Sequence, residues 1–407
     1  MRSLNFSFLS GYGLAAFALG IHMVVLSWLA VDSLAFSAQE VGYLNAISLA
    51  PSLVLVVVSG VLSDRAHPGR LLGTFQVLLA AGYFGIAFLY ANESLSKLAL
   101  YAYAFVTGFF NSLSQPLREK LSVLMKGNSI QRNIGWANSV RFSLQSIGIV
   151  LLTQVEWLGL SLVLFVMAGA ALISGLSYFR LNNLGLRANY LAETNDQGPI
   201  AAILQAARLV AKDSRIVSLF ALVASSGFLH LGAYMVAVPV VSDEVYGLGT
   251  ATYAAVQLCF YLGLVSTYFH LTQKKHVERP GYSSVFGLLY TALVVYSLSR
   301  GPTLYGFLFM IFAWGWVASH TAAHARMVLQ SIVSPEIVGR VIALYQLILF
   351  AAAFIGSLVT GWILGSQETE TFFFYLSLVS AAIFFWFYLA SPLFDIVQPE
   401  EKPEGVE

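Results

Sequence analysis

FLSGYGLAAFALGIHMVVLSWLA, residues 8–30, contains no Asp, Glu, Lys or Arg. It is long enough for a helix to cross the hydrocarbon core of a bilayer, which takes about 20 apolar residues. Eleven comparable stretches follow, at residues 41–62, 71–91, 98–115, 134–154, 158–178, 216–241, 251–271, 282–298, 303–322, 341–364 and 372–391. Because the bilayer core holds no water, such a stretch satisfies its backbone polar groups by forming a helix. The sequence therefore predicts an all-α integral membrane protein with twelve transmembrane helices.

The composition favours the same class of protein. The chain is 58% hydrophobic and only 10% charged, whereas a soluble globular protein carries about 25% charged residues. The net charge of +1 provides no basic field for nucleic acid. Cys259 is the only cysteine, which excludes an intrachain disulfide and a cysteine metal site. We expect no cofactor, no metal and a lipid bilayer around most of the chain.

Positive charge alternates from one gap between spans to the next. Of the 21 Lys and Arg residues, only Lys97 and Arg300 lie in the odd-numbered gaps, and Arg141 lies inside a span. The rest lie near the N-terminus, in the even-numbered gaps or in the C-terminal tail. The side that carries Lys and Arg is normally cytoplasmic. We therefore expect a multi-pass protein of the bacterial cytoplasmic (inner) membrane with both termini in the cytoplasm.

The longest gap divides the chain into two groups of six spans. Residues 1–179 form the first expected bundle and residues 216–394 the second. Between them, 180–215 is expected to be a cytoplasmic linker that contains an amphipathic helix at the lipid headgroups. A plain tether is the alternative interpretation of this linker. Residues 395–407 form an acidic cytoplasmic tail.

The two groups of spans resemble each other in sequence. Arg118 and Arg132 are separated by the same interval as Arg326 and Arg340, and the two pairs are related by a constant shift along the chain. The same shift relates His22 to His230 and Gly148 to Gly356. We place the four arginines in matching cytoplasmic loops. A parallel repeat of six spans is typical of carriers in which two bundles rock about a central site, although channels can also be repeats.

The gap after the second span reads Gly60-Val-Leu-Ser-Asp64-Arg65-Ala-His-Pro-Gly69-Arg70. This segment resembles the loop motif of the major facilitator superfamily, with two extra residues before the second glycine. The run Pro335-Glu-Ile-Val-Gly339-Arg340 is similar to the loop after span 10 in the branch that contains the enterobactin exporter and macrolide efflux pumps. The resemblance covers essentially the whole chain.

The resemblance implies a gating role for the motif. Asp64 would cap a neighbouring helix and pair with Arg65 or Arg70, while Gly60 allows close packing, so the cytoplasmic side is held shut. A solvated turn with ordinary positive-inside charges is the alternative. The matching turn of the second half, His270-Leu-Thr-Gln-Lys274-Lys275-His276, lacks the glycine and the aspartate. We therefore expect an asymmetric gate.

Ionisable side chains inside a span are costly, and they are functional candidates for that reason. His22 and His230 lie near the middles of spans 1 and 7, which the resemblance assigns to the cavity wall. Histidine titrates near physiological pH, so such a pair can carry a coupling proton or bind a substrate. A neutral histidine bonded between helices is the alternative for each.

The remaining candidates are Arg141 inside span 5, Asp32 at the outer end of span 1, and the amides of Asn111 and Gln115 in span 4. Arg141 either reaches the cytoplasmic face or faces a cavity and an anionic substrate. Asp32 is either a coupling acid or a solvated helix end. The two amides are candidates for lining a cavity or for hydrogen bonds between helices.

The sequence contains no nucleotide-binding glycine loop and no catalytic cluster, so we expect a protein that is not an enzyme. The predicted function is secondary transport of a small amphipathic solute, such as a siderophore or a drug-like metabolite, by alternating access. The branch resemblance favours proton-coupled export by a monomer. Import of such a solute, and a non-transporting receptor or assembly factor on the same scaffold, are the alternatives.

Overall fold

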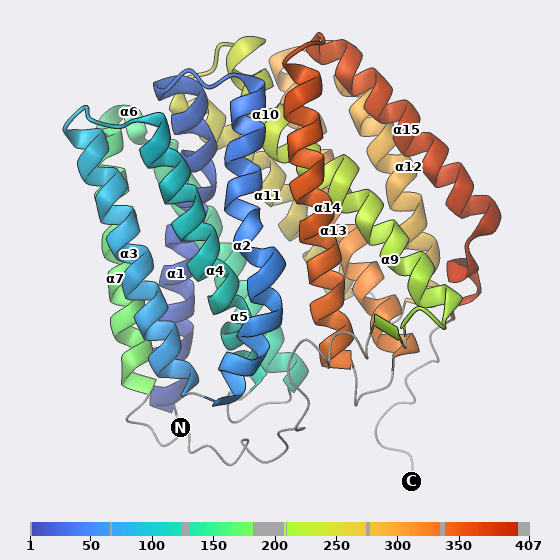
Figure 1. Cartoon of the computed structure of the whole chain (residues 1–407), viewed down its shortest axis with the longest axis horizontal. Helices are drawn as coiled ribbons and strands as arrows, with labels where there is room; N and C mark the ends of the chain where they lie inside the picture. Colours follow the sequence, from blue (N-terminus) through green and yellow to red (C-terminus); the bar gives the residue numbers. More distant parts are fainter. Residues whose placement is uncertain are drawn as a thin grey trace. The chain divides into compact units, whose positions relative to one another are not determined.

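The computed structural model describes residues 2–65, 67–123, 130–181, 207–208, 210–273, 277–333 and 338–397 (Figure 1). Within these ranges the regular structure is entirely helical, as expected. The helices of the first half are α1 (Arg2–Trp28), η1 (Leu29–Ser33), α2 (Ala38–Arg65), α3 (Pro68–Ala91), α4 (Lys97–Val123), α5 (Ile130–Leu152), α6 (Val155–Leu158) and α7 (Leu160–Phe179).

The second half repeats this order. Its helices are α9 (Ser214–Ser226), η3 (Gly227–Gly232), α10 (Ala233–Glu244), α11 (Thr250–Gln273), α12 (Pro280–Leu298), α13 (Leu304–Ile332), α14 (Val338–Leu364), α15 (Thr369–Ala390) and η4 (Pro392–Asp395). Two spans contain a turn of π-helix: η1 ends the first, and η3 lies within the seventh, between α9 and α10. Turns of this kind often mark functional positions in membrane and soluble helices alike.

Nine continuous helical segments of the described chain are long and apolar enough to span a membrane. The other three expected spans correspond to α2, α4 and α5, which contain 28, 27 and 23 residues. Several helices continue beyond their apolar part. The prediction that the four repeat arginines lie in loops is therefore wrong, because Arg118, Arg132, Arg326 and Arg340 all lie within helices, namely α4, α5, α13 and α14.

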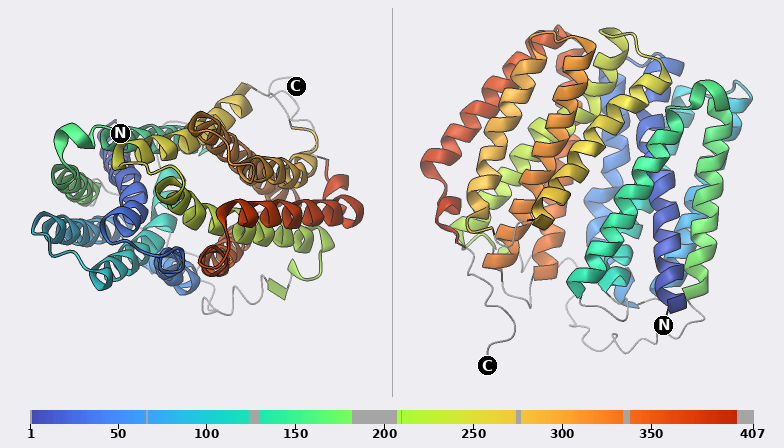
Figure 2. Two further views of the ribbon diagram at one scale, coloured as in Figure 1. Left: turned by 90° about the horizontal axis from the view of Figure 1, so that it is seen from above. Right: turned by 180° about the vertical axis from the view of Figure 1, so that it is seen from behind.

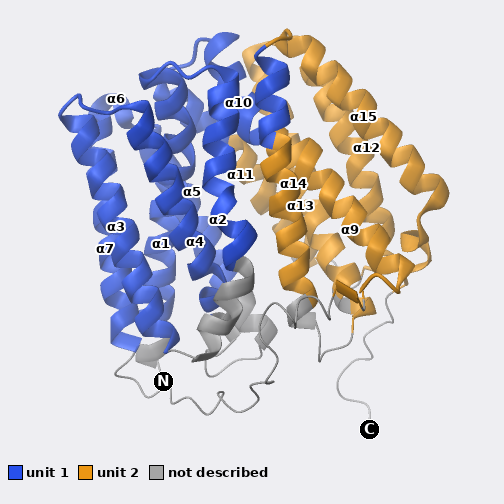
Figure 3. Cartoon of the chain, viewed as in Figure 1, with its two compact units in different colours: residues 1–202, 234–258, 357–365 blue, residues 203–233, 259–356, 366–407 orange. Residues whose placement is uncertain are grey.

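The described chain divides into two compact units (Figure 3). Unit 1 contains residues 1–202 together with 234–258 and 357–365. Unit 2 contains residues 203–233, 259–356 and 366–407. Unit 1 thus combines the first half with almost all of α10 and with one end each of α11 and α14. The division into bundles at the linker remains an expectation.

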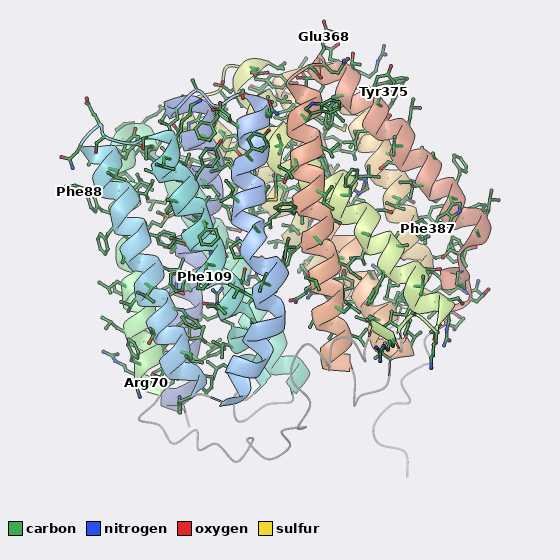
Figure 4. The ribbon with its side chains drawn as sticks, viewed as in Figure 1. Arg70, Phe88, Phe109, Glu368, Tyr375 and Phe387 are labelled. Atoms are coloured by element: carbon green, nitrogen blue, oxygen red, sulfur yellow. The ribbon has the colours of Figure 1, made fainter. Side chains whose placement is uncertain are left out.

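The helices of each half pack side by side, and the view from above in Figure 2 shows many of them end-on. In the first half α1 packs on α5, α2 on α4 and α3 on α7; in the second half α12 packs on α13 and α15. The side-chain view shows Arg70 and Phe88 at opposite ends of α3, and Phe109 on α4 beside it (Figure 4). The helix α3 therefore runs the full depth of the unit.

Two glycines related by the repeat allow helix backbones to touch. A Cβ atom at Gly148 would overlap the carbonyl oxygen of Phe17, where α5 crosses α1. A Cβ atom at Gly356 would overlap the carbonyl oxygen of Phe228, where α14 crosses η3. Small residues at helix crossings are the usual means of close packing in membranes. Both halves are therefore built around the same kind of crossing.

The C-terminal segment stays packed on unit 2 as far as Ile396. Leu393 is fully buried and Ile396 is 5% exposed, in a core that includes Phe384 and Phe387. The carbonyl oxygen of Leu393 lies where a Cβ atom at Gly281 would stand. The expected amphipathic helix of the linker and the acidic tail lie mostly outside the described residues.

Candidate functional site

His22 lies in the interior of the first half rather than on its surface. The imidazole is 5% exposed, and its Nδ1 lies 2.7 Å from the hydroxyl of Tyr103 on α4. The rings of Tyr83 on α3 and Tyr103 lie 5.6 and 5.3 Å from the imidazole, centroid to centroid. His22 is thus held between α1, α3 and α4 by hydrogen bonding and by ring contacts.

A series of polar side chains continues from this histidine along α4. The rings of Tyr83 and Tyr103 lie 6.1 Å apart, centroid to centroid, and Tyr83 also interacts with Asn111. The Nη2 atom of Arg118 donates to Oδ1 of Asn111 at 3.3 Å. We call His22, Tyr103, Tyr83, Asn111 and Arg118 the polar chain. On α4 its members stand at intervals of seven or eight residues, so they share one face of the helix.

Arg118 is the buried cation at the end of the polar chain. It is 8% exposed and interacts electrostatically with Tyr83 and Tyr178, the latter on α7. Charged side chains in a membrane interior are expensive and face protein or water. The burial of Arg118 was not expected from the sequence, which placed it in a loop. Here α4 simply continues past Pro116 to Val123, carrying the arginine into the packed region.

The second half lacks this chain at the positions related by the repeat. His230 lies in η3, is 7% exposed, and its Nε2 lies 2.6 Å from the hydroxyl of Ser380 on α15. Ile311 stands where the first half has Tyr103, and Thr291 where it has Tyr83. Arg326 is exposed and interacts with Tyr345. The two predicted histidines therefore have matching depths but different surroundings.

Unit 1 contains a second cluster, at the end away from the N-terminus of the chain. Trp28 is fully buried there, and its Nε1 donates to Oγ1 of Thr250 at 2.7 Å. Its ring stacks on Tyr253 at 4.7 Å between centroids. Tyr234 donates to Gln257, and Gln257 donates to Tyr253, each at 2.8 Å. These hydrogen bonds hold the ring of Tyr253 against Trp28.

A backbone contact adds to this cluster. The Nδ2 atom of Asn45 on α2 donates to the carbonyl oxygen of Met235 on α10 at 3.0 Å. Gly42 on α2 lies against Gly361 on α14. We call the contacts of Trp28 and Asn45 with α10 and α11 the distal contact. It joins α1 and α2 of the first half to helix ends of the second half within one compact unit.

The other predicted residues lie apart from these clusters. Arg141 is half-buried on α5, with its guanidinium carbon 5.4 Å from the centre of the Phe142 ring. Asp32 is exposed in η1 and interacts electrostatically with Asp243 on α10. Gln115 is half-buried on α4. Among the predicted residues whose side chains the structure describes, it groups His22, Asn111 and Arg118 in the polar chain.

The gating motif spans the end of α2 and the start of α3. The helix α2 runs through Gly60, Asp64 and Arg65, but the side chains of this stretch lie outside the described part of the chain. Gly69 is buried in the first turn of α3, and Arg70 is exposed beside it. Pro68 begins α3, where its missing N–H costs nothing. The role assigned to Asp64 remains a prediction.

Sequence reasoning missed Tyr83, Tyr103, Trp28 and Thr250. Aromatic residues are common in this chain and normally face lipid or pack, so no single one of them was distinguishable. The spacing of Tyr103, Asn111 and Arg118 along one helix face was the available signal. Among the described residues no group of three or more His, Cys, Asp or Glu could hold a metal ion.

Comparisons with known proteins agree with this architecture. The sequence pattern of the Major Facilitator Superfamily matches residues 8–281. The nucleoside transporter NupG superposes with a TM-score of 0.75 at 13% identity, over 95% of this chain and 98% of that one. A peptide transporter, POT, gives 0.72 at 15% identity, over 97% and 95%. The human organic anion transporter MFSD10 (TETRAN) gives 0.66 at 16%, over 94% and 98%.

No curated protein matches the chain. At these identities the structural matches show the fold alone, which is the twelve-helix fold of two six-helix bundles expected from the spans. The family pattern covers well over half of the sequence and includes the loop motif. The chain therefore belongs to the Major Facilitator Superfamily and is a multi-pass membrane protein.

Proposed function

We propose that the protein is a secondary transporter that moves a small amphipathic solute across the bacterial inner membrane by alternating access, coupled to protons and in the direction of export. The observation that carries this proposal is the distal contact. Within unit 1 it joins helices of the first half to helices of the second half, and a carrier makes such a contact on one side of the membrane in one of its two states.

The distal contact is specific and can also be opened. It consists of one hydrogen bond from Trp28, one ring stack on Tyr253 and one hydrogen bond from Asn45. Each hydrogen bond contributes about 0.5–1.5 kcal/mol net, and an aromatic pair contributes about 0.5–1.5 kcal/mol beyond its area. A sum of a few kcal/mol holds a state that a bound solute can still overcome.

The charge distribution assigns the two ends. By the positive-inside rule the end with the distal contact faces outward and the termini face the cytoplasm. The motif from Gly60 to Arg70 then lies at the cytoplasmic end and supplies the opposite gate. Closing one end while the other opens is what separates a carrier from a channel.

The solute class rests on the resemblance. The branch that contains the enterobactin exporter and macrolide efflux pumps favours export of a siderophore or drug-like compound. The named structural neighbours are transporters of nucleosides, peptides and organic anions.

Solute flux in proteoliposomes tests the proposal. The full chain is reconstituted with a pH-sensitive dye inside, and ethidium and a catecholate siderophore are tried as probes with and without a pH gradient. We expect probe movement against its gradient and an opposite movement of protons. Trp28→Ala should lower the flux, because the closed outer state loses both its hydrogen bond and its ring stack.

The outcomes separate the alternatives. Flux driven by the solute gradient without proton movement would remove proton coupling, and accumulation toward the cytoplasmic side would favour import. Absence of flux for every probe, with Trp28→Ala behaving like the wild type, would favour a non-transporting receptor or assembly factor. Protein orientation in the vesicles is checked by protease access to the C-terminal tail.

A further inference from the structure

Two histidines lie one helical turn apart on α13, within unit 2, and belong neither to the polar chain nor to the distal contact. His320 is half-buried and His324 is 2% exposed. Their imidazole rings lie 4.1 Å apart, centroid to centroid, at an interplanar angle of 44°. Helix positions four apart share one face. The structure therefore brings the two rings themselves together, and not only their backbones.

The hydrogen bond of His324 decides which of its nitrogens can be a metal ligand. Its Nδ1 lies 2.7 Å from the carbonyl oxygen of His320. A carbonyl oxygen only accepts, so Nδ1 donates and carries the proton. In the neutral imidazole the lone pair that binds a metal ion is then on Nε2. Metal-binding histidines almost always use their second ring nitrogen in this way, as a donor to a carboxylate, a backbone carbonyl or water.

The ring of His320 is also held in position. It stacks on Trp316 at 5.2 Å between centroids, and Thr267 on α11 donates to the carbonyl oxygen of Trp316 at 2.8 Å. A ligand that is held in place before the ion arrives loses little freedom on binding. Two nitrogens that bind one ion at about 2.0–2.1 Å each lie no more than about 4 Å apart. Ring centres 4.1 Å apart are compatible with that limit.

Met327 adds a soft donor on the same face of α13. It stands 3 residues after His324 and 7 after His320, so the three residues follow one stripe of the helix. Met327 is half-buried, as His320 is. The stripe is therefore not sealed within the core, and an ion can approach it from the side of these two residues.

We infer that His320, His324 and Met327 form a binding site for copper(I). Imidazole nitrogen suits zinc, copper, iron and nickel, whereas thioether sulfur selects copper(I), so copper is the metal that both kinds of donor favour. Copper(I) accepts low coordination numbers, so the site needs no acid and no cysteine. The sequence alone did not predict this ion, because a methionine in an apolar span is indistinguishable from a packing residue.

The site belongs to the second half alone. The repeat places Ser112, Pro116 and Glu119 at the positions of His320, His324 and Met327. None of these three offers an imidazole or a thioether, so the architecture that the halves share does not require the metal-binding set. The inference is also independent of the proposed function, because binding is measured without a solute and without flux.

Competition with a coloured copper(I) chelator, bathocuproine disulfonate, tests the site. The full chain is purified in detergent, stripped of metal with EDTA and titrated under reducing, oxygen-free conditions. We expect about one equivalent of copper(I) to bind. His320→Ala and His324→Ala should each weaken binding by at least about tenfold, since even the loss of an outer hydrogen-bond partner of a ligand costs about 10–100-fold. Met327→Leu should weaken it by about tenfold and remove the sulfur neighbour from the X-ray absorption spectrum of the bound copper.

The chain offers a matched control for each ligand type. Met310→Leu changes a half-buried methionine on the same helix, away from the histidines, and His270→Ala changes an exposed histidine on α11. Both should bind copper(I) as the wild type does. Thermal unfolding shows which variants are folded. His320→Ala carries the test where His324→Ala does not fold, because His320 is only half-buried.

The inference is overturned if the wild type binds copper(I) no more tightly than folded His320→Ala, or if His270→Ala weakens binding as much. Equal effects of Met327→Leu and Met310→Leu, with nitrogen as the only neighbour of the bound metal, would exclude the thioether and with it the assignment to copper(I). Tight binding of zinc by the two histidines without copper(I) binding would overturn the assignment in the same way.

Discussion

The interior of the first half and that of the second half differ at the positions that the repeat relates. Between α1, α3 and α4 lie a histidine, two tyrosines, an asparagine and an arginine, all hydrogen-bonded or in contact. The second half keeps the histidine, replaces Tyr103 by Ile311 and leaves Arg326 at the surface. Helices of the same order thus pack without the polar chain, so packing alone does not require it.

The same comparison separates the features that both halves share from those that only the first half has. Both halves use a glycine crossing, at Gly148 and at Gly356, and both place a histidine at mid-depth. Only the first half has the polar chain, and only the first half has the Gly60 to Arg70 motif. What the halves share is architecture, whereas what they do not share is where we expect regulation and coupling.

The largest expected effect tests the shared architecture. Gly148→Leu and Gly356→Leu should each destabilise the protein by about 3 kcal/mol, because the new side chain meets a backbone carbonyl that cannot move aside. Thermal unfolding in detergent measures this. Gly85→Leu is the control, because nothing lies within 4 Å of a Cβ atom there. Equal tolerance of all three changes would show that the crossings are not close.

The next effect tests the difference between Arg118 and Arg326. Arg118→Ala should cost about 2 kcal/mol more unfolding free energy than Arg326→Ala, since it leaves the Asn111 oxygen without its donor in a buried place. Arg326 is exposed, so its loss costs little. Unfolding curves of the two variants, taken side by side, measure the difference. Matching losses would mean that the two repeat positions are equivalent after all.

A smaller effect concerns the motif that only the first half contains. Asp64→Asn should lower transport about tenfold while leaving membrane insertion intact, as expected for one charge-assisted hydrogen bond. The related position of the second half is Thr272, and Thr272→Asn should leave transport unchanged. Probe flux and the yield of folded protein are measured together. Unchanged flux in well-expressed Asp64→Asn would remove the gating role.

The smallest effect compares two exposed ion pairs. Lys97 bonds Glu40 across α4 and α2, whereas Arg215 bonds Asp213 only two residues away. The hydrogen bond from Lys97 holds the pKa of Glu40 below its usual value, against the opposing effect of burial. The carboxylate therefore stabilises the fold above pH 4.5, the unfolded value, and this contribution is lost as the pH falls through the lowered folded pKa.

Lys97→Ala should therefore lower the melting temperature slightly at neutral pH, by less than about 1 kcal/mol in free energy because the pair is exposed. The difference from the wild type should vanish in acid. Arg215→Ala should matter less, because its partner already caps the first turn of α9 through the backbone. A pH series of melting temperatures measures both. A difference that persists in acid would assign the effect to packing instead.

Much of the fold was predictable because its signals are local. The length of an apolar stretch and the alternation of Lys and Arg are properties of short segments, and they place all twelve spans. Helix ends were harder to predict. The helix α4 continues through Arg118 to Val123 because the propensity for helix does not stop where the apolar residues stop, and packing shelters the charge.

The site was predictable only in part. His22 and Asn111 were candidates as ionisable or polar groups inside spans, and they do meet one another through the polar chain. Tyr83 and Tyr103 were not candidates, because the sequence does not indicate which of its 20 tyrosines contact polar side chains. Asp32 and Arg141 were candidates on the same grounds as His22. In the structure Asp32 lies at an exposed helix end, and Arg141 is half-buried on α5.

The sequence by itself determined the membrane class, the number of spans and the six-plus-six repeat. Each of these depends on residue type averaged over a span or on a match between distant segments. Only the tertiary structure decided that His22 bonds Tyr103, 81 residues away, and that Trp28 bonds Thr250, 222 residues away. Such contacts depend on how helices rotate and cross, which a hydrophobic pattern with polar residues on several faces leaves undetermined.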